Sequence, residues 1–321
     1  MRTTASLLVL TLLLSHASAG EVPNEEARKH YLHGRFQKAA ELLRNQSNAL
    51  PQDPEIRLWL GKSHLKNQQV DDSIRELEKA VELDPKNGLY HLWLGRAYGE
   101  KAEHASIFTA FGWARKVRQA FESAVQLAPE NMDARFDLLE FYIEAPGIVG
   151  GGQDKAQSLA EAIATANARL GHTARARILR KQKKWDQALE ELQQAAAKYS
   201  DNADAHLDLA QLRLEREDYR GAEQAALEAG RIQPNLPRAR MLLAAARVGI
   251  GKDLGAVEKS LREIAAGPLS DDDPSFAEAY YWLGLALGKQ NRPSEARSAL
   301  QAALRFDPDY EKAKDALSRV R

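Results

Sequence analysis

Apolar and small residues recur along this chain at a fixed spacing of 34 positions. The tripeptide Trp-Leu-Gly at 59–61 returns at 93–95 and appears a third time at 282–284. Ala188 and Ala222 are also 34 residues apart. A constant period of this length is typical of repeat architectures, in which each unit is a small helical hairpin that buries its apolar face against its neighbours.

The landmarks of one repeat are clearest in its second unit. Leu60 and Gly61 belong to the first helix of the predicted hairpin, Leu77 and Ala80 to the second, and Pro85 follows. Small residues let neighbouring helices approach closely, and proline marks the place where a helix must end. The same landmarks predict a helical hairpin in most of the other units.

The repeat spacing is broken twice. Pro129 lies 44 residues after the preceding landmark proline, which is one repeat plus ten residues. Pro308 lies 74 residues after Pro234, which is two repeats plus six. The first interval predicts an insert near 102–118, and the second predicts a degenerate unit at 235–268.

These landmarks resemble the tetratricopeptide repeat (TPR), which has a Leu-Gly pair in its first helix, an alanine in its second and a closing proline. The chain departs from that pattern at Trp59, which directly precedes Leu60. The resemblance covers residues 20–321 and implies an all-α fold, a right-handed α-solenoid of about eight hairpins. A C-terminal helix from Asp309 to Arg321 is expected to cap an elongated, curved body. Both inserts look similar to those of secreted bacterial TPR proteins of undefined role.

The first residues have the organisation of a secretory signal peptide. Arg2 is followed by an apolar run from Leu7 to Leu14 and by the small-residue sequence Ala17-Ser18-Ala19. The apolar run is too short for a stable membrane anchor. We therefore expect a signal peptide at residues 1–19, export to the periplasm or the exterior, and no integral membrane segment after cleavage.

Charge and composition narrow the function. Basic and acidic residues number 45 each, so no net field favours nucleic acid, and no nucleic-acid partner is expected. The chain has no cysteine, which excludes disulfides and thiolate chemistry. No catalytic triad or metal-ligand spacing is present, so we expect no enzyme activity, no cofactor and no metal.

The TPR resemblance also implies where a partner would bind, because the first helices of successive units line a concave groove that holds protein segments. Carried over by register, the groove positions are Lys62, Lys66, Arg96, Glu100, Phe136, Glu140, Glu144, Arg177, Arg180, Lys181 and Tyr281. They predict basic patches on either side of an acidic band, suited to a mixed-charge segment. A solvated face without a partner is the equal alternative.

The insert at 102–118 carries Phe108, Phe111 and Trp113 beside several basic residues. Aromatic side chains next to arginines often anchor interfaces, but helical spacing of apolar residues favours packing into the local core. A glycine-rich segment at 145–152 is the second irregularity. It has neither the preceding strand nor the Gly-Lys-Ser/Thr sequence of a phosphate-binding loop, so a flexible connection is expected.

The interpretation that follows is a protein-interaction scaffold or chaperone of the bacterial cell envelope, which binds a protein segment in its groove. One alternative is an accessory enzyme or ligand-binding protein with a site formed by the two inserts. Self-assembly of the solenoid through its ends is another.

Overall fold

The computed structural model describes residues 25–320, apart from the side chain of Ile107, so the predicted signal peptide lies outside the described residues. Within this range the chain forms seventeen α-helices and one 3-10 helix, and no β-strand. The helices are α1 (Glu25–Leu32), α2 (Phe36–Ala49), α3 (Pro54–Lys66), α4 (Val70–Leu83), α5 (Gly88–Glu103), α6 (Ile107–Leu127), α7 (Met132–Glu144), η1 (Gly147–Val149), α8 (Gln153–Ala166), α9 (Ala168–Lys181), α10 (Trp185–Lys198), α11 (Ala203–Glu215), α12 (Tyr219–Ile232), α13 (Pro237–Ile250), α14 (Leu254–Ala266), α15 (Phe276–Lys289), α16 (Pro293–Phe306) and α17 (Glu311–Arg319).

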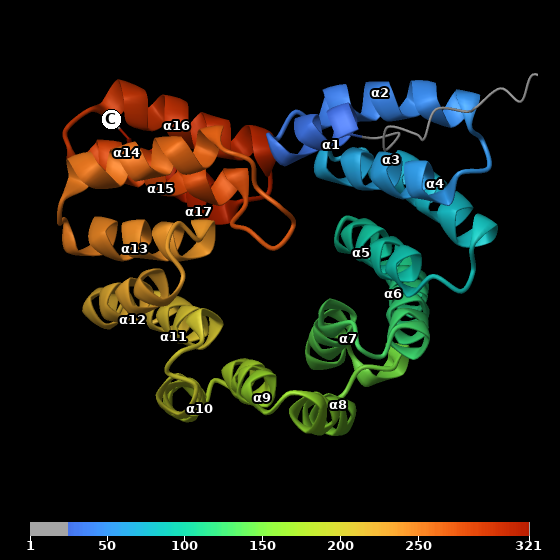
Figure 1. Ribbon diagram of the computed structural model, residues 1–321, viewed down its shortest axis with the longest axis horizontal. Helices are drawn as coiled ribbons and strands as arrows, with labels where there is room; N and C mark the ends of the chain where they lie inside the picture. The colour runs from blue at the N-terminus through green and yellow to red at the C-terminus, as the bar shows by residue number, and fades with distance from the viewer. Residues whose placement is uncertain (1–24, 321) are drawn as a thin grey trace, which may run out of the picture.

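Consecutive helices pair as hairpins, from α1 with α2 to α15 with α16, and α17 packs on the last pair (Figure 1). This confirms the predicted all-α solenoid with eight hairpins and a capping helix. The landmark prolines lie where the sequence places them, each two residues beyond the end of a helix: Pro51, Pro85, Pro129, Pro234 and Pro308.

Asparagine and aspartate side chains set the starts of the first helices of several hairpins. Asp53 accepts hydrogen bonds from the backbone N–H groups of Glu55 and Ile56 at 2.9 and 3.1 Å. Asn87, Asn131, Asn167 and Asn202 make equivalent contacts at the starts of α5, α7, α9 and α11. Each such cap stabilises its helix by about 1 kcal/mol, because it satisfies a backbone N–H that the helix leaves without a partner.

Glycine in the first helix lets the second helix approach. A Cβ atom built on Gly61 would lie 2.5 Å from the side chain of Leu77, and one on Gly284 would lie 2.6 Å from Leu300. In the third hairpin a Cβ on Gly95 would lie 2.5 Å from the ring of Phe121. The repeated glycine is therefore required by the close packing of α3 on α4, α5 on α6 and α15 on α16.

We expect the substitution Gly95→Ala to lower the free energy of unfolding by about 1–3 kcal/mol, because the added methyl overpacks the contact with Phe121. Gly99→Ala in the same helix is the matched control, since a Cβ there meets nothing within 4 Å. That control is expected to be neutral or to stabilise by up to about 1 kcal/mol through helix propensity. Urea denaturation measures both, and equal effects of the two substitutions would contradict the packing argument.

The third hairpin absorbs the insert by lengthening both of its helices. α5 has 16 residues and α6 has 21, whereas α7 and α8 have 13 and 14. At 1.5 Å per residue, α6 is about 31 Å long and α7 about 20 Å. The first turns of α6 therefore extend beyond the neighbouring repeat.

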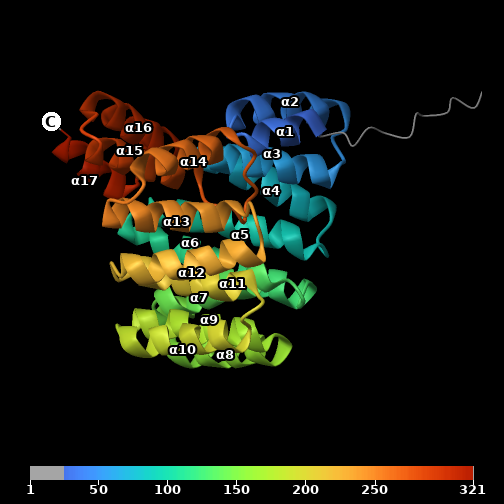
Figure 2. The ribbon, with the colours of Figure 1, turned by 60° about the vertical axis from the view of Figure 1, so that its left-hand side comes forward.

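The solenoid closes into a ring, which corrects the expected elongated body with separate ends. Figures 1 and 2 show the first hairpins beside the last ones. The segment between α14 and α15 reaches the first hairpin, where the backbone N–H of Leu269 donates to the carbonyl oxygen of Leu32 at 2.7 Å. The Gln68 amide donates to the carbonyl oxygen of Phe306 at 3.2 Å.

Aromatic rings fill the contact between the two ends. The ring of Phe36 lies edge-on to both Phe276 and Phe306, with centroids 6.3 Å away in each case. Phe276 and Phe306 stack at 5.1 Å. The left-handed backbone of Gly34 (φ +69°) brings the chain against these two rings, 3.0 Å from where its Cβ would be. Because both ends bury apolar surface here, the open form that the repeat pattern predicts is less favourable than the ring.

Candidate functional site

The first helices of the hairpins form the inner wall of the ring, and the second helices lie outside them (Figure 1). The groove positions expected from the repeat register lie on α3, α5, α7, α9 and α15. The structure thus brings most of these side chains to one continuous surface. Their burial and partners differ from one part of the wall to the next.

Charged residues of neighbouring first helices are ion-paired along this wall. Arg177 lies 3.7 Å from Glu140, and the neighbouring Lys181 pairs with Glu144. Arg180 pairs with Glu215 at 2.8 Å. The carboxylates of α7 and the cations of α9 therefore form two adjacent bands of opposite charge that pair across their boundary. The wall presents both signs of charge side by side.

Two aromatic groove positions are only partly accessible. The guanidinium of Arg177 lies over the ring of Phe136, 4.5 Å from its centroid. Tyr281 packs against Tyr310, which precedes the capping helix, with centroids 5.1 Å apart. Tyr281 is therefore packed against the C-terminal end of the chain, whereas Phe136 and Arg177 lie together on the inner wall.

Lys62 has a structural contact that its groove position does not reveal. Its side chain is 7% exposed and its ammonium group lies 2.7 Å from the carboxylate of Asp271, in the segment that closes the ring. The ammonium is also 4.0 Å and 4.4 Å from the ring centroids of Trp59 and Trp93. Tyr31 donates to the same carboxylate at 2.5 Å. We call these five residues the clasp.

Burial shifts the ionisation of the clasp. It lowers the pKa of Lys62, although the charge of Asp271 acts in the opposite direction. Burial by itself would raise the pKa of Asp271, but Lys62 and the Tyr31 hydroxyl hold that pKa below its usual value of 3.8. Lys62 therefore joins the two ends of the ring and does not offer its charge to a partner. The nearby Lys66 is exposed.

The aromatic residues of the insert divide into two groups. Trp113 packs against Tyr98 of α5, with centroids 5.7 Å apart. Phe108 is 92% exposed and Phe111 is 44% exposed. The expectation that these rings complete the local core is thus right for Trp113 and wrong for the other two. The physical reason is the length of α6, whose first turns extend beyond the shorter α7 of the next hairpin.

An apolar groove lies beside Phe111, which forms part of its lining, and we call it the insert groove. It has a volume of about 660 Å³ and runs between the C-terminal ends of α5 and α7, with α6 as its floor. Its apolar lining includes Ala110, Phe111, Ala114, Val117 and Phe121 of α6, Phe141 of α7, and Pro146 and Val149 beyond α7. The two irregular segments of the sequence therefore meet at one site.

The glycine-rich segment is an ordered turn, which corrects the expectation of a flexible connection. The side chain of Val149 is 2% exposed. The backbone N–H groups of Gly150, Gly151 and Gly152 donate to carbonyl oxygens of Gly147, Pro146 and Tyr142. Because these donors are used within the turn, they do not form a phosphate cradle.

Comparison with sequence profiles identifies the family to which the chain belongs. Profiles described as tetratricopeptide repeat match residues 30–98, 179–246 and 277–310, which together are more than half of the chain. The chain belongs to the tetratricopeptide-repeat family. Tetratricopeptide repeats stack into extended concave surfaces that bind other proteins, and they generally act as non-enzymatic scaffolds. No curated protein sequence matches this TPR protein.

Solved structures with similar folds are distant in sequence. The yeast Tom70 structure has a TM-score of 0.58 at 14% identity, covering 95% of this chain and 65% of its own. The APC/C hetero-tetramer Cut9-Hcn1 has a TM-score of 0.47 at 16% identity, covering 92% of this chain and 54% of its own. A tetratricopeptide repeat protein from Parabacteroides merdae has a TM-score of 0.44 at 14% identity, with coverages of 92% and 95%. This TPR protein thus spans less than two thirds of the first two relatives, and the likeness to Tom70 concerns the fold.

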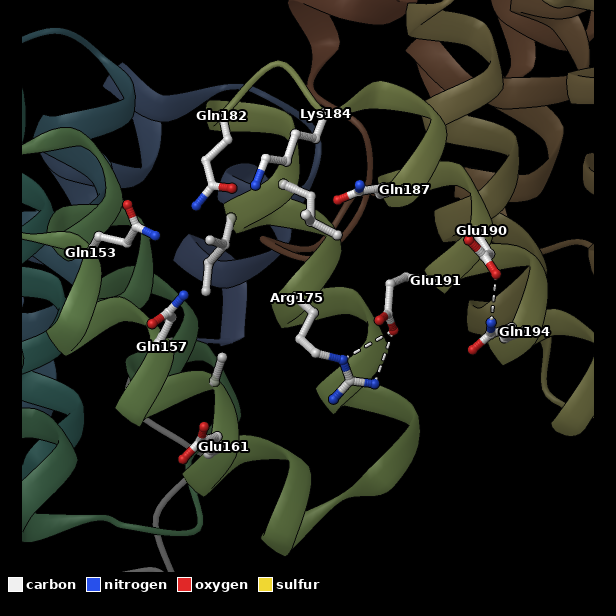
Figure 3. Close-up of a pocket in the computed structure, with 13 residues that line it drawn as sticks. Gln153, Gln157, Glu161, Arg175, Gln182, Lys184, Gln187, Glu190, Glu191 and Gln194 are labelled. Atoms are coloured by element: carbon white, nitrogen blue, oxygen red, sulfur yellow. Dashed lines mark hydrogen bonds and ion pairs between the residues drawn. The ribbon is translucent and has the colours of Figure 1, made fainter.

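A polar groove on α8, α9 and α10 was not anticipated from the sequence (Figure 3). It has a volume of about 620 Å³, and amide side chains of Gln153, Gln157, Gln182, Gln187 and Gln194 line it. Glutamine at i and i+4 in α8 was a sequence signal for this face. At its edge Arg175 donates to Glu191 at 3.0 Å. Burial alone would raise the pKa of Glu191, but hydrogen bonds from Arg175 and His172 lower it.

Residues 25–320 of the TPR protein contain no cluster of three or more His, Cys, Asp or Glu side chains arranged to hold a metal ion. The His30 side chain lies 3.8 Å from Glu26, and the His33 ring bonds to the backbone of Lys29. None of the helices in this part of the chain combines the length and apolarity needed to cross a membrane.

Proposed function

We propose that this TPR protein is an exported, non-enzymatic scaffold or assembly factor of the bacterial cell envelope. It holds a segment of a partner protein against the inner wall of its ring. The family supports a role in protein binding, and the signal-like N-terminal sequence supports export.

The observation that carries the proposal is the row of ion pairs between α7 and α9. The paired side chains are 38–53% exposed in Arg177, Glu140, Lys181 and Glu144. Ion pairs this exposed contribute about 0–1 kcal/mol to folding, so stability does not account for their alignment. An extended segment of mixed charge could bond at once to the carboxylates of α7 and to the cations of α9, because each helix presents one sign of charge at regular intervals.

The proposal predicts the effect of removing three inner-wall charges. Replacing Arg177, Arg180 and Lys181 with glutamine should reduce capture of the native partner in a crosslinking pull-down from the cell envelope. With that partner purified, the dissociation constant should rise about tenfold and depend less on salt. The matched control removes three exposed charges from outer helices through Arg75→Gln, Lys79→Gln and Arg231→Gln. Equal capture by both triple variants would contradict the proposed site.

A second candidate function follows from the meeting of the two irregular segments. The insert groove is within the size range of small-molecule sites, about 300–1,000 Å³. An accessory enzyme or ligand-binding protein would then use this site. Deleting Gly150 to Gly152 should release a small molecule that native mass spectrometry detects on the wild-type chain. A wild-type chain that carries no such molecule would remove this candidate.

A further inference from the structure

The floor of the insert groove has the spacing of a helix-packing seam. Ala110, Ala114, Val117 and Phe121 follow one another along α6 at intervals of four, three and four residues. This is the apolar repeat with which one helix packs along another. Val117 and Phe121 are buried at the inner end of the seam, whereas Ala110 and Ala114 are only partly covered.

No helix of this hairpin or the next covers the outer end of the seam. α7 is eight residues shorter than α6, so the first turns of α6 extend beyond it, and on the α5 side Trp113 packs against Tyr98. Phe108 and Phe111 flank the uncovered turns with 92% and 44% of their surfaces exposed. Ile148, in the turn beyond α7, is 71% exposed. Of these three side chains, Phe111 lines the groove itself, and an exposed large apolar side chain beside an apolar groove marks an interaction surface.

Carboxylates border the groove on both sides. Glu100 and Glu103 lie on the α5 side, and Glu140 and Glu144 lie on the α7 side. Among the described residues that line the groove, Arg96 is the only positively charged one, and its guanidinium is paired with the carboxylate of Asp137 at 2.6 Å. Burial and the nearby Glu100 raise the pKa of Glu103, so a cation placed there would stabilise its charged form.

We propose that the insert groove docks an amphipathic helix of a partner protein, with apolar residues along its centre and Lys or Arg on both flanks. The apolar face would continue the seam over Ala110, Ala114 and Phe111. The basic flanks would face the carboxylates of α5 and α7. This deepens the proposed function, because it rests on the chain being a protein-binding scaffold and adds a second surface with its own partner chemistry.

The two rims differ in their existing partners. Glu140 and Glu144 already face Arg177 and Lys181 of α9. On the α5 side, the carboxylate of Glu100 lies 3.2 Å from the ring of His104. Glu103 has no ion-pair partner within the described part of the chain. Cations of the partner helix would therefore gain more from the α5 rim than from the α7 rim.

A designed peptide tests the proposal with the mature chain. The probe is a 21-residue helix with leucine at the seam positions and lysine at the flanking positions, and a second peptide has glutamate in place of each lysine. Fluorescence anisotropy should show the lysine peptide binding about tenfold more tightly or better, with affinity that falls as salt is added. Equal affinity of the two peptides would overturn the proposal.

Variants of the chain locate the binding. The double substitution Phe108→Ser and Phe111→Ser should weaken the lysine peptide about tenfold, and Glu100→Gln with Glu103→Gln should reduce its salt dependence. The matched control, Leu50→Ser with Leu227→Ser, changes side chains that are 48% and 45% exposed elsewhere and should leave affinity unchanged. Undiminished binding to the phenylalanine double variant would refute the docking site. A benzophenone on the peptide should crosslink to residues 107–121 and 145–149.

The same measurements separate this inference from the proposed function. The inner-wall triple variant at Arg177, Arg180 and Lys181 should bind the lysine peptide at least as tightly as the wild type does, because Glu140 and Glu144 of the groove rim lose their competing cations. Loss of peptide binding in that variant would place the peptide on the inner wall and overturn the inference alone. If the wild-type chain captured the native partner but did not bind the lysine peptide, the inference alone would likewise be overturned. Phe108-dependent sedimentation with anionic phospholipid vesicles would also overturn it, because the exposed rings would then serve a membrane surface.

Discussion

Replacing Asp271 with asparagine is expected to open the ring. The substitution leaves the ammonium group of Lys62, which is 7% exposed, without its carboxylate. Removing one partner of a buried ion pair costs about 3–5 kcal/mol, and we expect about 3 kcal/mol because the Asp271 side chain is 23% exposed. Small-angle X-ray scattering should record a larger radius of gyration, because the segment between α14 and α15 no longer binds the first hairpins.

The neighbouring Asp272 provides the matched control for the clasp. Burial and the charges of Asp133 and Asp271 raise the pKa of Asp272, so its negative charge is unfavourable in the folded chain. Asp272→Asn should therefore leave the ring closed. Adding Lys62→Met to Asp271→Asn should restore part of the closure, because no unpaired charge then remains buried between Trp59 and Trp93. An unchanged scattering profile for Asp271→Asn alone would show that the aromatic contacts are sufficient.

Truncating Leu207 to alanine is expected to destabilise the chain strongly. This side chain of α11 is fully buried, in a cluster with α10, α12 and α13. Leucine-to-alanine substitutions at such sites cost about 3–5 kcal/mol, because they combine lost burial with the cavity that is left. Urea denaturation followed by circular dichroism measures the difference.

Leu227→Ala tests whether burial is the cause. This leucine lies in the adjacent helix α12 but is 45% exposed, so its truncation should change the free energy of unfolding by less than about 0.5 kcal/mol. If both truncations lowered the free energy of unfolding equally, local helix propensity rather than core packing would explain the lost stability. The comparison is clean because the chemical change and the local helical context are alike.

Closure of the ring changes which residues a partner can reach. Lys62 and Lys66 are four residues apart on α3 and share a groove register, yet the first is buried in the clasp and the second is exposed. The insert groove, by contrast, has its apolar floor on α6 and no clasp residue in its lining, although Glu100 and Glu103 of its rim also border the cleft beside Trp93 and Asp271. The Asp271→Asn variant should therefore retain the peptide affinity of the insert groove.

The sequence by itself determined the repeating units. The number of hairpins, the helix ends before Pro85 and Pro129, and the glycine contacts of Gly61 and Gly95 all follow from the residue pattern. These features are predictable because they depend on residues within one repeat, where backbone hydrogen bonds, caps and close helix contacts join positions close in sequence. The family and the all-α fold follow from them.

Only the tertiary structure decided how the repeats meet over long distances. Tyr31 and Asp271 bond across 240 positions of the chain, and no local pattern specifies this contact. The small rotation between neighbouring hairpins accumulates around the ring, so whether its ends meet depends on the whole stack. The same geometry pairs the inner-wall charges and leaves Phe108 uncovered, because exposure is set by the lengths of adjacent helices and not by the spacing within one.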